Sequence, residues 1–516
     1  MATDKVIATN AKALRAKYGA DGFAKIAAAL DAMVAADARR GLSTRVIPID
    51  SSADMARYGA PVGSASSARA AKAAIDAIYA REQPDYIMIL GASDVVPLVR
   101  LKNPVWEPDG DDDDRLVPSD LPYACEAGYS LDANRFVGPT RVVGRLPDLV
   151  GARNPKYLLR LMRVATGYKM LPVAAYQRYF GLSAQAWQSS TGLSLSKLFG
   201  NEKDLRTTPP RGPKWTLAEL APRAHFINCH GSHRDPQYYG QPPRKQDFPP
   251  AHSAELLPGK ITPGTVLAAE CCYGAEMYDP AKTQGQAGIA YTYLGEGAYG
   301  VFGSTTIAYG PSSGNSSADL ICRYFLNAVM EGASLGRAAL EARQQFSELY
   351  SHLSPIDLKT LAQFYLLGDP SVHPAHVTPH ALNKTRAFKT AFAKSKDAGP
   401  RLLRRDRMRR VGGNLQRTLP ATRRADNRVR PSAEIVRVLR GAARESDTKS
   451  HVSMHFRVTP KTRVAAAAAT HRTVHVLMSA QGVDMRARAK GPPRVVAIVA
   501  TAENGRLLHL RRLRGR

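Results

Sequence analysis

The chain has 516 residues, of which 44% are hydrophobic and 22% charged, so it is long enough for roughly two to four globular domains. It lacks any uncharged apolar run of about 18 residues, which argues against a membrane-spanning helix. Its first residues also lack the apolar core of a secretory signal. The five cysteines are sparse and odd in number, which argues against a disulfide framework and favours a reducing compartment. We therefore expect a cytoplasmic protein.

The formal net charge of +28 is spread very unevenly along the chain. Residues 381–516 hold 33 Lys and Arg against 8 Asp and Glu, a net charge of +25. The first 380 residues carry a net charge of only +3, as an ordinary globular protein does. Any inference from charge to a partner therefore applies only to the last 136 residues.

The first elements alternate between helix and strand. Three- and four-residue spacing of apolar side chains predicts helix over residues 4–41 and again over 66–81. Residues 44–49 form a β-like run, and residues 84–90 read as a buried strand that ends on glycine. This alternation predicts a mainly parallel sheet with helices on both faces, in which functional groups gather at the carboxyl ends of strands.

The middle of the chain is more irregular. The acidic run at 107–114 is expected to be a solvated, mobile loop, because it lacks the alternating spacing of a calcium loop. A helix is predicted over 156–169. The polar stretch at 183–215 reads mostly as an insertion.

Two apolar runs of strand length end on reactive residues. Residues 223–229 lead into His230-Gly231, and residues 265–270 lead into Cys271-Cys272. Neighbouring strands that end in this way hold an imidazole and a thiol at one edge of a sheet. Further on, a third buried strand is predicted at 298–304, followed by helices at 318–331 and 334–346.

An imidazole beside a thiol is the pair that a cysteine peptidase needs, because it activates the thiol and then protonates the leaving amine. The N–H groups of Gly231 and Cys272 are candidate donors to the oxyanion. Successive side chains of a strand point to opposite faces, so only one of Cys271 and Cys272 faces the site. Two alternatives remain open. The residues are ordinary buried ones, or they bind zinc. The zinc ligands would come from Cys229, His230, His233, Cys271 and Cys272.

An ordered series of short motifs over roughly residues 5–375 resembles the gingipain-like family of cysteine peptidases, in the caspase-fold clan. They include the Pro84–Pro97 strand, Ser119-Asp-Leu-Pro-Tyr123, Val143-Gly-Arg-Leu-Pro147, His230-Gly-Ser232, Glu270-Cys-Cys272, Gly303-Ser304, Glu331–Gly336 and Leu367-Gly-Asp-Pro370. The resemblance implies a caspase-like or gingipain-like α/β fold. Residues 1–150 would form an N-terminal subdomain and 151–380 the catalytic subdomain.

The resemblance also implies the roles of individual residues. His230 would be the catalytic imidazole and Cys272 the nucleophile of a cysteine endopeptidase that needs no cofactor, with Cys271 as a packed neighbour. An acid upstream of the histidine orients it in this family, and Glu126 is the candidate here, with Asp120 as its competitor. A catalytically silent scaffold and a transpeptidase are the alternative functions.

One departure from the family concerns specificity. Gingipains select basic residues through acidic groups, one of them in the loop after Gly-Ser. Residues 303–312 of this chain hold no carboxylate, so a preference for Lys or Arg does not carry over. Asp148, Glu276 and Asp279 are the other candidate acids for the pocket. The protein or peptide substrates are expected to be a few selected targets.

The basic tail divides in two. Residues 381–450 are Arg-rich with little periodic apolar content and are expected to be a mostly disordered linker. Residues 451–516 are expected to form a small basic β unit, with a hairpin at Asn504-Gly505. Residues 381–516 are predicted to localise or regulate the peptidase. Their partner would be a polyanion, either nucleic acid or an acidic protein.

Overall fold

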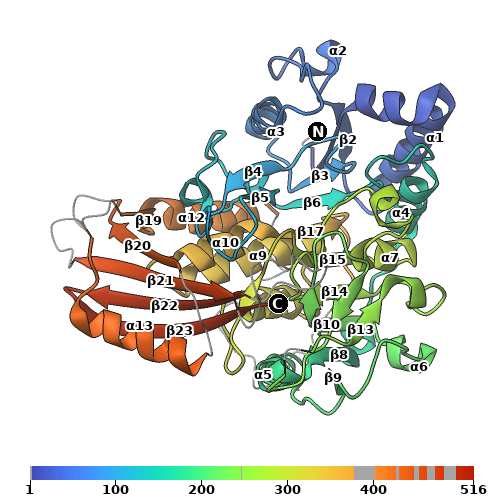
Figure 1. The fold of residues 1–516 in the computed structure, drawn as a ribbon. Coiled ribbons are helices and arrows are strands. Elements are labelled where there is room, and N and C mark those ends of the chain that lie inside the picture. Colours follow the sequence, from blue (N-terminus) through green and yellow to red (C-terminus); the bar gives the residue numbers. More distant parts are fainter. Residues whose placement is uncertain are drawn as a thin grey trace.

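A ten-stranded sheet forms the centre of the molecule in the computed structural model (Figure 1). The structure describes residues 3–245, 247–376, 401–425, 429–446, 452–461, 471–480 and 495–516. The strand order is β2-β1-β3-β6-β17-β15-β14-β10-β8-β9. All neighbours pair in parallel except β17 and β15, so the sheet consists of two parallel halves that run in opposite directions. The predicted mainly parallel α/β fold is confirmed.

The first half of the sheet contains most of the N-terminal strands. It is built from β1 (Lys5–Thr9), β2 (Thr44–Pro48), β3 (Tyr86–Leu90), β6 (Val143–Leu146) and β17 (Phe364–Gly368). Its helices are α1 (Ala11–Arg39), α2 (Ser52–Met55) and α3 (Ala68–Glu82). The prediction of helix from residue 4 onward is wrong for β1. Val6, Ile7 and Thr9 are β-branched, and this short run is buried between two strands, where strand geometry is favoured.

The second half of the sheet carries the two reactive strands. It consists of β8 (Tyr179–Ala184), β9 (Leu205–Thr208), β10 (Ala224–Asn228), β14 (Val266–Ala269) and β15 (Gly300–Ser304). Its helices are α4 (Lys156–Gly167), α5 (Gln188–Phe199), α6 (Leu217–Leu220), α7 (Ile289–Gly295), α8 (Ala318–Met330), α9 (Leu335–Glu348) and α10 (Pro355–Gln363). Helix α4 contacts both α1 and α7. In a second group, α8 contacts both α5 and α9.

The polar stretch at 183–215 is part of the main sheet and not an insertion. It contains the end of β8, all of α5 and β9. The polar side chains misled the prediction because several of them are buried and bonded within the fold. The hydroxyls of Ser183 and Thr191, for example, lie 2.8 Å apart.

Shorter elements complete the body. The remaining strands are β4 (Val99–Lys102), β5 (Leu116–Ser119), β7 (Leu171–Pro172), β11 (His230–Gly231), β12 (Gln237–Tyr239), β13 (Pro250–Ser253), β16 (Tyr309–Gly310) and β18 (Ala375–His376). Six short 3₁₀ helices lie at Leu121–Ala124, Ala133–Phe136, Val173–Tyr176, Gln185–Trp187, Ala254–Leu256 and Pro280–Thr283.

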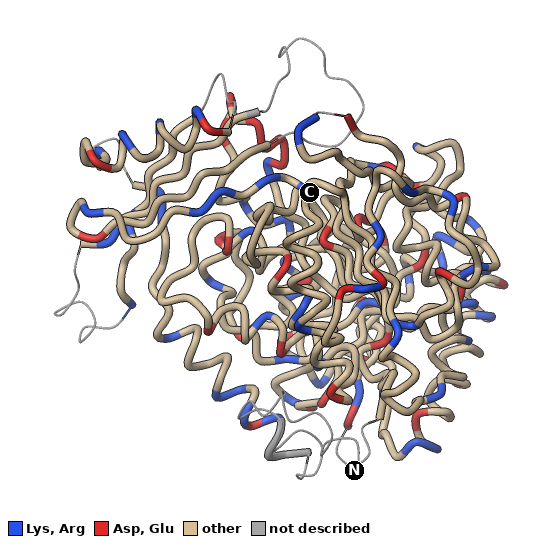
Figure 2. Tube along the Cα trace, turned by 90° about the horizontal axis from the view of Figure 1, so that it is seen from below, with Lys and Arg blue, Asp and Glu red and all other residues tan. Residues whose placement is uncertain are grey.

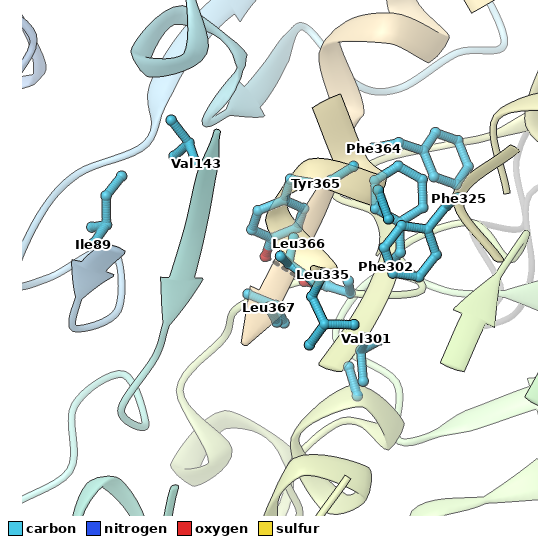
Figure 3. Packing of buried hydrophobic residues seen from close by; sticks show 14 of the residues in the cluster. Ile89, Val143, Val301, Phe302, Phe325, Leu335, Phe364, Tyr365, Leu366 and Leu367 are labelled. Atoms are coloured by element: carbon cyan, nitrogen blue, oxygen red, sulfur yellow. Dashed lines mark hydrogen bonds between the residues drawn. The ribbon is translucent and has the colours of Figure 1, made fainter. Parts of the chain in front are cut away.

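Aromatic side chains join the two halves of the sheet where β15 and β17 pair (Figure 3). The ring of Phe302 on β15 stacks on Phe325 of α8, with centroids 4.5 Å apart. The ring centroid of Phe364 on β17 lies 5.8 Å from that of Phe302. Each of these side chains is buried, which contributes about 1.5–3 kcal/mol per residue relative to exposure. The predicted division at residue 150 therefore separates two parts of one continuous sheet.

The basic tail contains more regular structure than expected. Its elements are α12 (Arg401–Thr418), β19 (Ala421–Arg424), α13 (Ala433–Glu445), β20 (Val452–Thr459), β21 (Arg472–Ala480), β22 (Val495–Glu503) and β23 (Arg506–Gly515). Within 381–450, residues 381–400, 426–428 and 447–450 lie outside the described residues. Over the rest, the expected disorder is replaced by α12, β19 and α13. Helix α13 is stable because Ile435, Leu439 and Ala442 form a buried apolar stripe.

The predicted hairpin is confirmed, and it belongs to a larger sheet. Asn504 and Gly505 turn β22 into β23 with positive φ angles of 50° and 79°, as such a turn requires. The sheet has six strands in the order β16-β23-β22-β21-β20-β19. Because β16 (residues 309–310) precedes the tail in sequence and belongs to the body, this sheet joins the tail to the body.

The described part of the chain contains no helix that is both long enough and apolar enough to cross a bilayer.

Candidate active site

The ends of β10 and β14 bring the predicted histidine and cysteine segments together. The two strands pair in parallel, with Ile227 opposite Ala269, so both run toward the same edge of the sheet. A side chain at Gly231 would place its Cβ only 1.8 Å from the carbonyl oxygen of Cys272. Glycine is therefore needed at position 231, since any larger residue would push the two segments apart.

A glutamine holds the imidazole of His230. The imidazole Nε2 lies 2.9 Å from Oε1 of Gln241. The amide Nε2 of Gln241 donates to the carbonyl oxygen of Lys245 at 3.1 Å. The imidazole lies against the rings of Trp187 and Phe248, at centroid distances of 4.3 and 4.7 Å. No pattern in the sequence marked Gln241, because it lies in an irregular loop after β12.

The two adjacent cysteines have different surroundings. The Cys271 thiol lies in the sheet core, 3.9 Å from the Ile227 carbonyl oxygen. The Cys272 thiol accepts a hydrogen bond from the N–H of Ala308 at 3.2 Å, in the segment that leads into β16. Burial raises the pKa of both thiols above the ordinary value. Only Cys272 therefore faces the segment that borders the site.

The main-chain N–H of Cys272 holds a carbonyl group. It donates to the carbonyl oxygen of Arg516, the last residue of the chain as given, at 3.0 Å. A donor fixed at a strand end beside a thiol is the geometry that stabilises a tetrahedral oxyanion. The predicted oxyanion donor at Cys272 thus has a peptide-type oxygen bound to it.

The two candidate orienting acids make contacts of their own. Glu126 is half exposed and pairs with Arg409 of α12 at 3.4 Å. Asp120 is buried and receives two hydrogen bonds from the guanidinium of Arg145, at 2.6 and 2.8 Å. That pair joins two of the family-like motifs and is structural. The described side chain that is hydrogen-bonded to the imidazole is Gln241.

The acidic loop packs against the site. It is not the solvated loop that the sequence predicted. Asp112 is buried and pairs with Lys359 at 2.5 Å. Asp114 accepts from the Ile307 N–H at 2.8 Å and from the Tyr273 hydroxyl at 2.9 Å. The loop is ordered because burying these carboxylates brings them a cation and several donors.

A polar pocket encloses the side chain of Arg516. Its guanidinium lies 2.9 Å from Oδ1 of Asp319 and 2.9 Å from the Pro311 carbonyl oxygen. It also lies over the Trp187 ring, 4.4 Å from the centroid. The carboxylate of this pocket therefore comes from the first turn of α8, outside the loop where the family resemblance placed it.

A second carboxyl group borders this pocket. Glu270 is fully buried, and burial together with the nearby Asp319 carboxylate raises its pKa well above the ordinary value. Burial and the neighbouring carboxylate thus both favour the protonated form of Glu270, and the carboxylate that pairs with the guanidinium is that of Asp319. The three acids considered earlier lie elsewhere. Asp148 contacts Tyr18 and Lys17, Glu276 contacts His233, and Asp279 caps a short 3₁₀ helix.

The residues weighed as zinc ligands do not gather in one place. His233 is half exposed and pairs with Glu276 at 2.8 Å, which raises the pKa of the imidazole. Throughout the described ranges, no three His, Cys, Asp or Glu side chains come together as a metal site.

Comparison with known proteins identifies one family. Residues 254–375 match the family model of peptidase family C25, the gingipain family, which confirms the predicted resemblance. The matched segment includes Cys271 and Cys272 and begins after His230. It supports a peptidase of the cysteine class. No curated protein matches the chain in sequence.

The solved structures that resemble this chain include proteases at low sequence identity. One, described as "Structure of Protease", covers 99% of this chain and 97% of its own, with 12% identity and a TM-score of 0.48. Two structures of the Saccharomyces cerevisiae separase–securin complex cover 45% and 47% of this chain and 14% of each of theirs. Their identities are 14% and 12%, and their TM-scores 0.29 and 0.28.

Proposed function

We propose, from the match of residues 254–375 to peptidase family C25, that this chain is a cysteine endopeptidase with Cys272 as nucleophile and His230 as proton carrier. The observation that carries the proposal is the carbonyl oxygen of Arg516 at 3.0 Å from the Cys272 N–H. This contact puts a carbonyl at the residue whose thiol would attack it.

The proposed reaction has two steps. The Cys272 thiol gives its proton to His230, and the sulfur attacks the substrate carbonyl carbon, whose oxygen becomes an oxyanion held by N–H donors. The C–N bond then breaks, and the imidazolium returns the proton to the leaving amine. Water hydrolyses the resulting thioester, with His230 again taking and returning a proton, and the free thiol is restored.

The contacts of Gln241 support this use of the histidine. The Gln241 amide nitrogen donates to the Lys245 carbonyl, so its Oε1 is left to accept a hydrogen bond. The acceptor favours the imidazole tautomer with its proton on Nε2. In this tautomer Nδ1 carries the lone pair that would take the thiol proton. Gln241 thus takes the orienting role that the family resemblance gave to Glu126.

The test uses the two adjacent cysteines as a matched pair. Cys272→Ala and His230→Ala are expected to abolish cleavage of peptide substrates, whereas Cys271→Ala retains it, because Cys271 lies in the sheet core. Hydrolysis of a fluorogenic peptide library measures the effect, and circular dichroism checks that each variant is folded. Retained cleavage by Cys272→Ala would refute the assignment.

The same assay separates the alternative functions. A catalytically silent scaffold gives no cleavage in any variant and no labelling of Cys272 by an electrophilic peptide. A transpeptidase transfers the acyl group to an added amine in preference to water, which mass spectrometry of the products distinguishes from hydrolysis.

A further inference from the structure

We propose that β23 occupies the substrate groove of the catalytic body and that Arg516 fills its primary pocket, so that the site stays closed while β23 is in place. This inference rests on the proposed function and adds a regulatory element to it. Figure 1 shows the C-terminal end of the chain beside β14 and β10, the two strands that carry Cys272 and His230.

The first support is the main chain of β23. It pairs antiparallel with β16, with Gly515 opposite Tyr309 and Arg514 opposite Gly310. Beyond the pairing, the Arg516 N–H donates to the Ala308 carbonyl oxygen at 2.9 Å. In addition, the main-chain N–H of Cys272 donates a hydrogen bond to the Arg516 carbonyl oxygen. A peptide bound as an added strand makes this pattern of main-chain hydrogen bonds.

The second support is the Arg516 side chain, which is fully buried. Burying a guanidinium is costly unless a carboxylate and further acceptors compensate for the lost water. The Asp319 carboxylate and the Pro311 carbonyl supply these contacts, and Trp187 covers the flat face of the guanidinium. All of these hydrogen bonds are donated by Nη2, and Nε and Nη1 are buried without a hydrogen-bond partner among the described residues, so the pocket offers an arginine one carboxylate, one carbonyl oxygen and an aromatic face.

The pocket and the histidine share one wall. The Trp187 ring lies under the guanidinium of Arg516 and also contacts the imidazole of His230, to which it is tilted by 56°. An arginine in this pocket therefore lies beside the catalytic pair. The burial that raises the Cys272 pKa keeps the thiol protonated, and hence weakly nucleophilic, in this closed state.

The rest of β23 is also anchored to the body. Leu513 is buried in a cluster with Ile307, Tyr309 and Ile356 of the body. Arg511 makes a two-point contact with the Asp357 carboxylate, at 2.7 and 2.9 Å. Arginines recur along the segment that ends at the C-terminus, shown in blue in Figure 2. These anchors raise the effective concentration of Arg516 at the pocket, so that a separate peptide competes poorly.

The test measures binding without catalysis, in a Cys272→Ala background. The probe is the peptide Leu-Arg-Gly-Arg, a copy of residues 513–516, with a fluorophore on its amino end. Two variants empty the pocket while keeping Leu513 in its cluster: Arg516→Ala, and removal of residues 515–516. Arg512→Ala is the matched control, because Arg512 lies on the same strand and is exposed.

We expect both pocket-emptying variants to bind the probe at least tenfold more tightly than the parent, and Arg512→Ala to bind it as the parent does. Adding Asp319→Asn to the 515–516 deletion should weaken binding again by at least tenfold. Equal probe affinity in the parent and both pocket-emptying variants would overturn the proposal. Tight binding of the probe that Asp319→Asn does not weaken would also overturn it.

Failure of the proposed function would look different. If the pocket-emptying variants bind the probe tightly but the same variants with Cys272 intact cleave no peptide, the groove assignment stands and the peptidase assignment fails. With a working peptidase, the Arg516→Ala enzyme should cleave small arginyl peptides at least tenfold faster than the parent.

Discussion

A single residue, Gln241, connects the imidazole of His230 to the surrounding loop. Its amide is held at one end by the Lys245 carbonyl and at the other by the imidazole nitrogen. Trp187 and Phe248 restrict the ring from the sides. In the described contacts, a neutral amide and two aromatic rings thus hold the imidazole of His230.

Replacing Gln241 tests this role. Gln241→Ala is expected to lower kcat/KM by about 10- to 100-fold, because a hydrogen bond to a group that becomes charged is worth about 1.5–3 kcal/mol. Gln241→Glu should restore orientation and move the imidazole pKa upward, since a carboxylate stabilises the imidazolium. The pH profile of kcat/KM measures both effects. Gln177→Ala, at an exposed site, is the control, and an unchanged profile in Gln241→Glu would contradict the role.

At the scale of elements, the acidic loop and α10 fix the position of the segment before β16. Lys359 of α10 is buried and pairs with Asp112 and Asp114, at 2.5 and 3.2 Å. Asp114 in turn holds the Ile307 N–H, and Asp112 accepts from the hydroxyl of Tyr309 at 2.8 Å. Residues 307–309 are thus held against Cys272 by charges that come from two distant parts of the chain.

Removing the cation should destabilise the whole protein. Lys359→Met leaves two buried carboxylates without their cation, which is expected to cost about 3–5 kcal/mol in the free energy of unfolding. Urea denaturation followed by tryptophan fluorescence measures the loss. Arg160→Met breaks an exposed pair with Glu296 and should cost less than about 1 kcal/mol. Similar losses in the two variants would contradict the argument.

At the scale of the whole molecule, the basic tail is joined to the body by specific charge pairs. Arg409, Arg511 and Arg516 contact Glu126, Asp357 and Asp319. These arginines are used within the chain, so polyanion binding through residues 381–516, which stays a prediction, would depend on the remaining ones.

The stability of the whole molecule should fall as the solution is acidified below neutral pH. Burial lowers the pKa of His225 to about 4 and that of His252 to about 3, and both rings contact the Tyr293 hydroxyl. Between pH 6.5 and about 4 the unfolded chain therefore binds protons that the folded chain does not. The lost stability is on the order of 3 kcal/mol for His225 alone, at about 1.4 kcal/mol per pKa unit.

Unfolding free energies measured from pH 7 to pH 4.5 test this expectation. His225→Asn should make the dependence on pH shallower, even if it lowers stability at pH 7. His471→Asn, which replaces an exposed histidine of the tail, should leave the slope unchanged. A slope that is the same in the parent and in His225→Asn would contradict the prediction.

Local signals in the sequence were sufficient for many elements and for the main residues of the candidate site. Apolar runs of strand length indicated β10, β14 and β15, and the Asn504-Gly505 pair indicated the hairpin, because these patterns act between near neighbours. The match to peptidase family C25 covers residues 254–375, and this segment contains Cys272. For the polar stretch around α5 and for the acidic loop, composition predicted exposure, and the structure shows buried side chains. The prediction failed because the bonding partners of these side chains lie far away in sequence.

The amino-acid sequence by itself determined the alternating α/β fold, the histidine and cysteine segments and the charge of the tail. Only the tertiary structure decided that Gln241 contacts His230, that Asp319 supplies the pocket charge, and that β23 pairs with β16. Each of these contacts joins residues that periodicity and spacing do not relate. Their geometry depends on how the two sheets pack together, and that packing is a property of the folded chain as a whole.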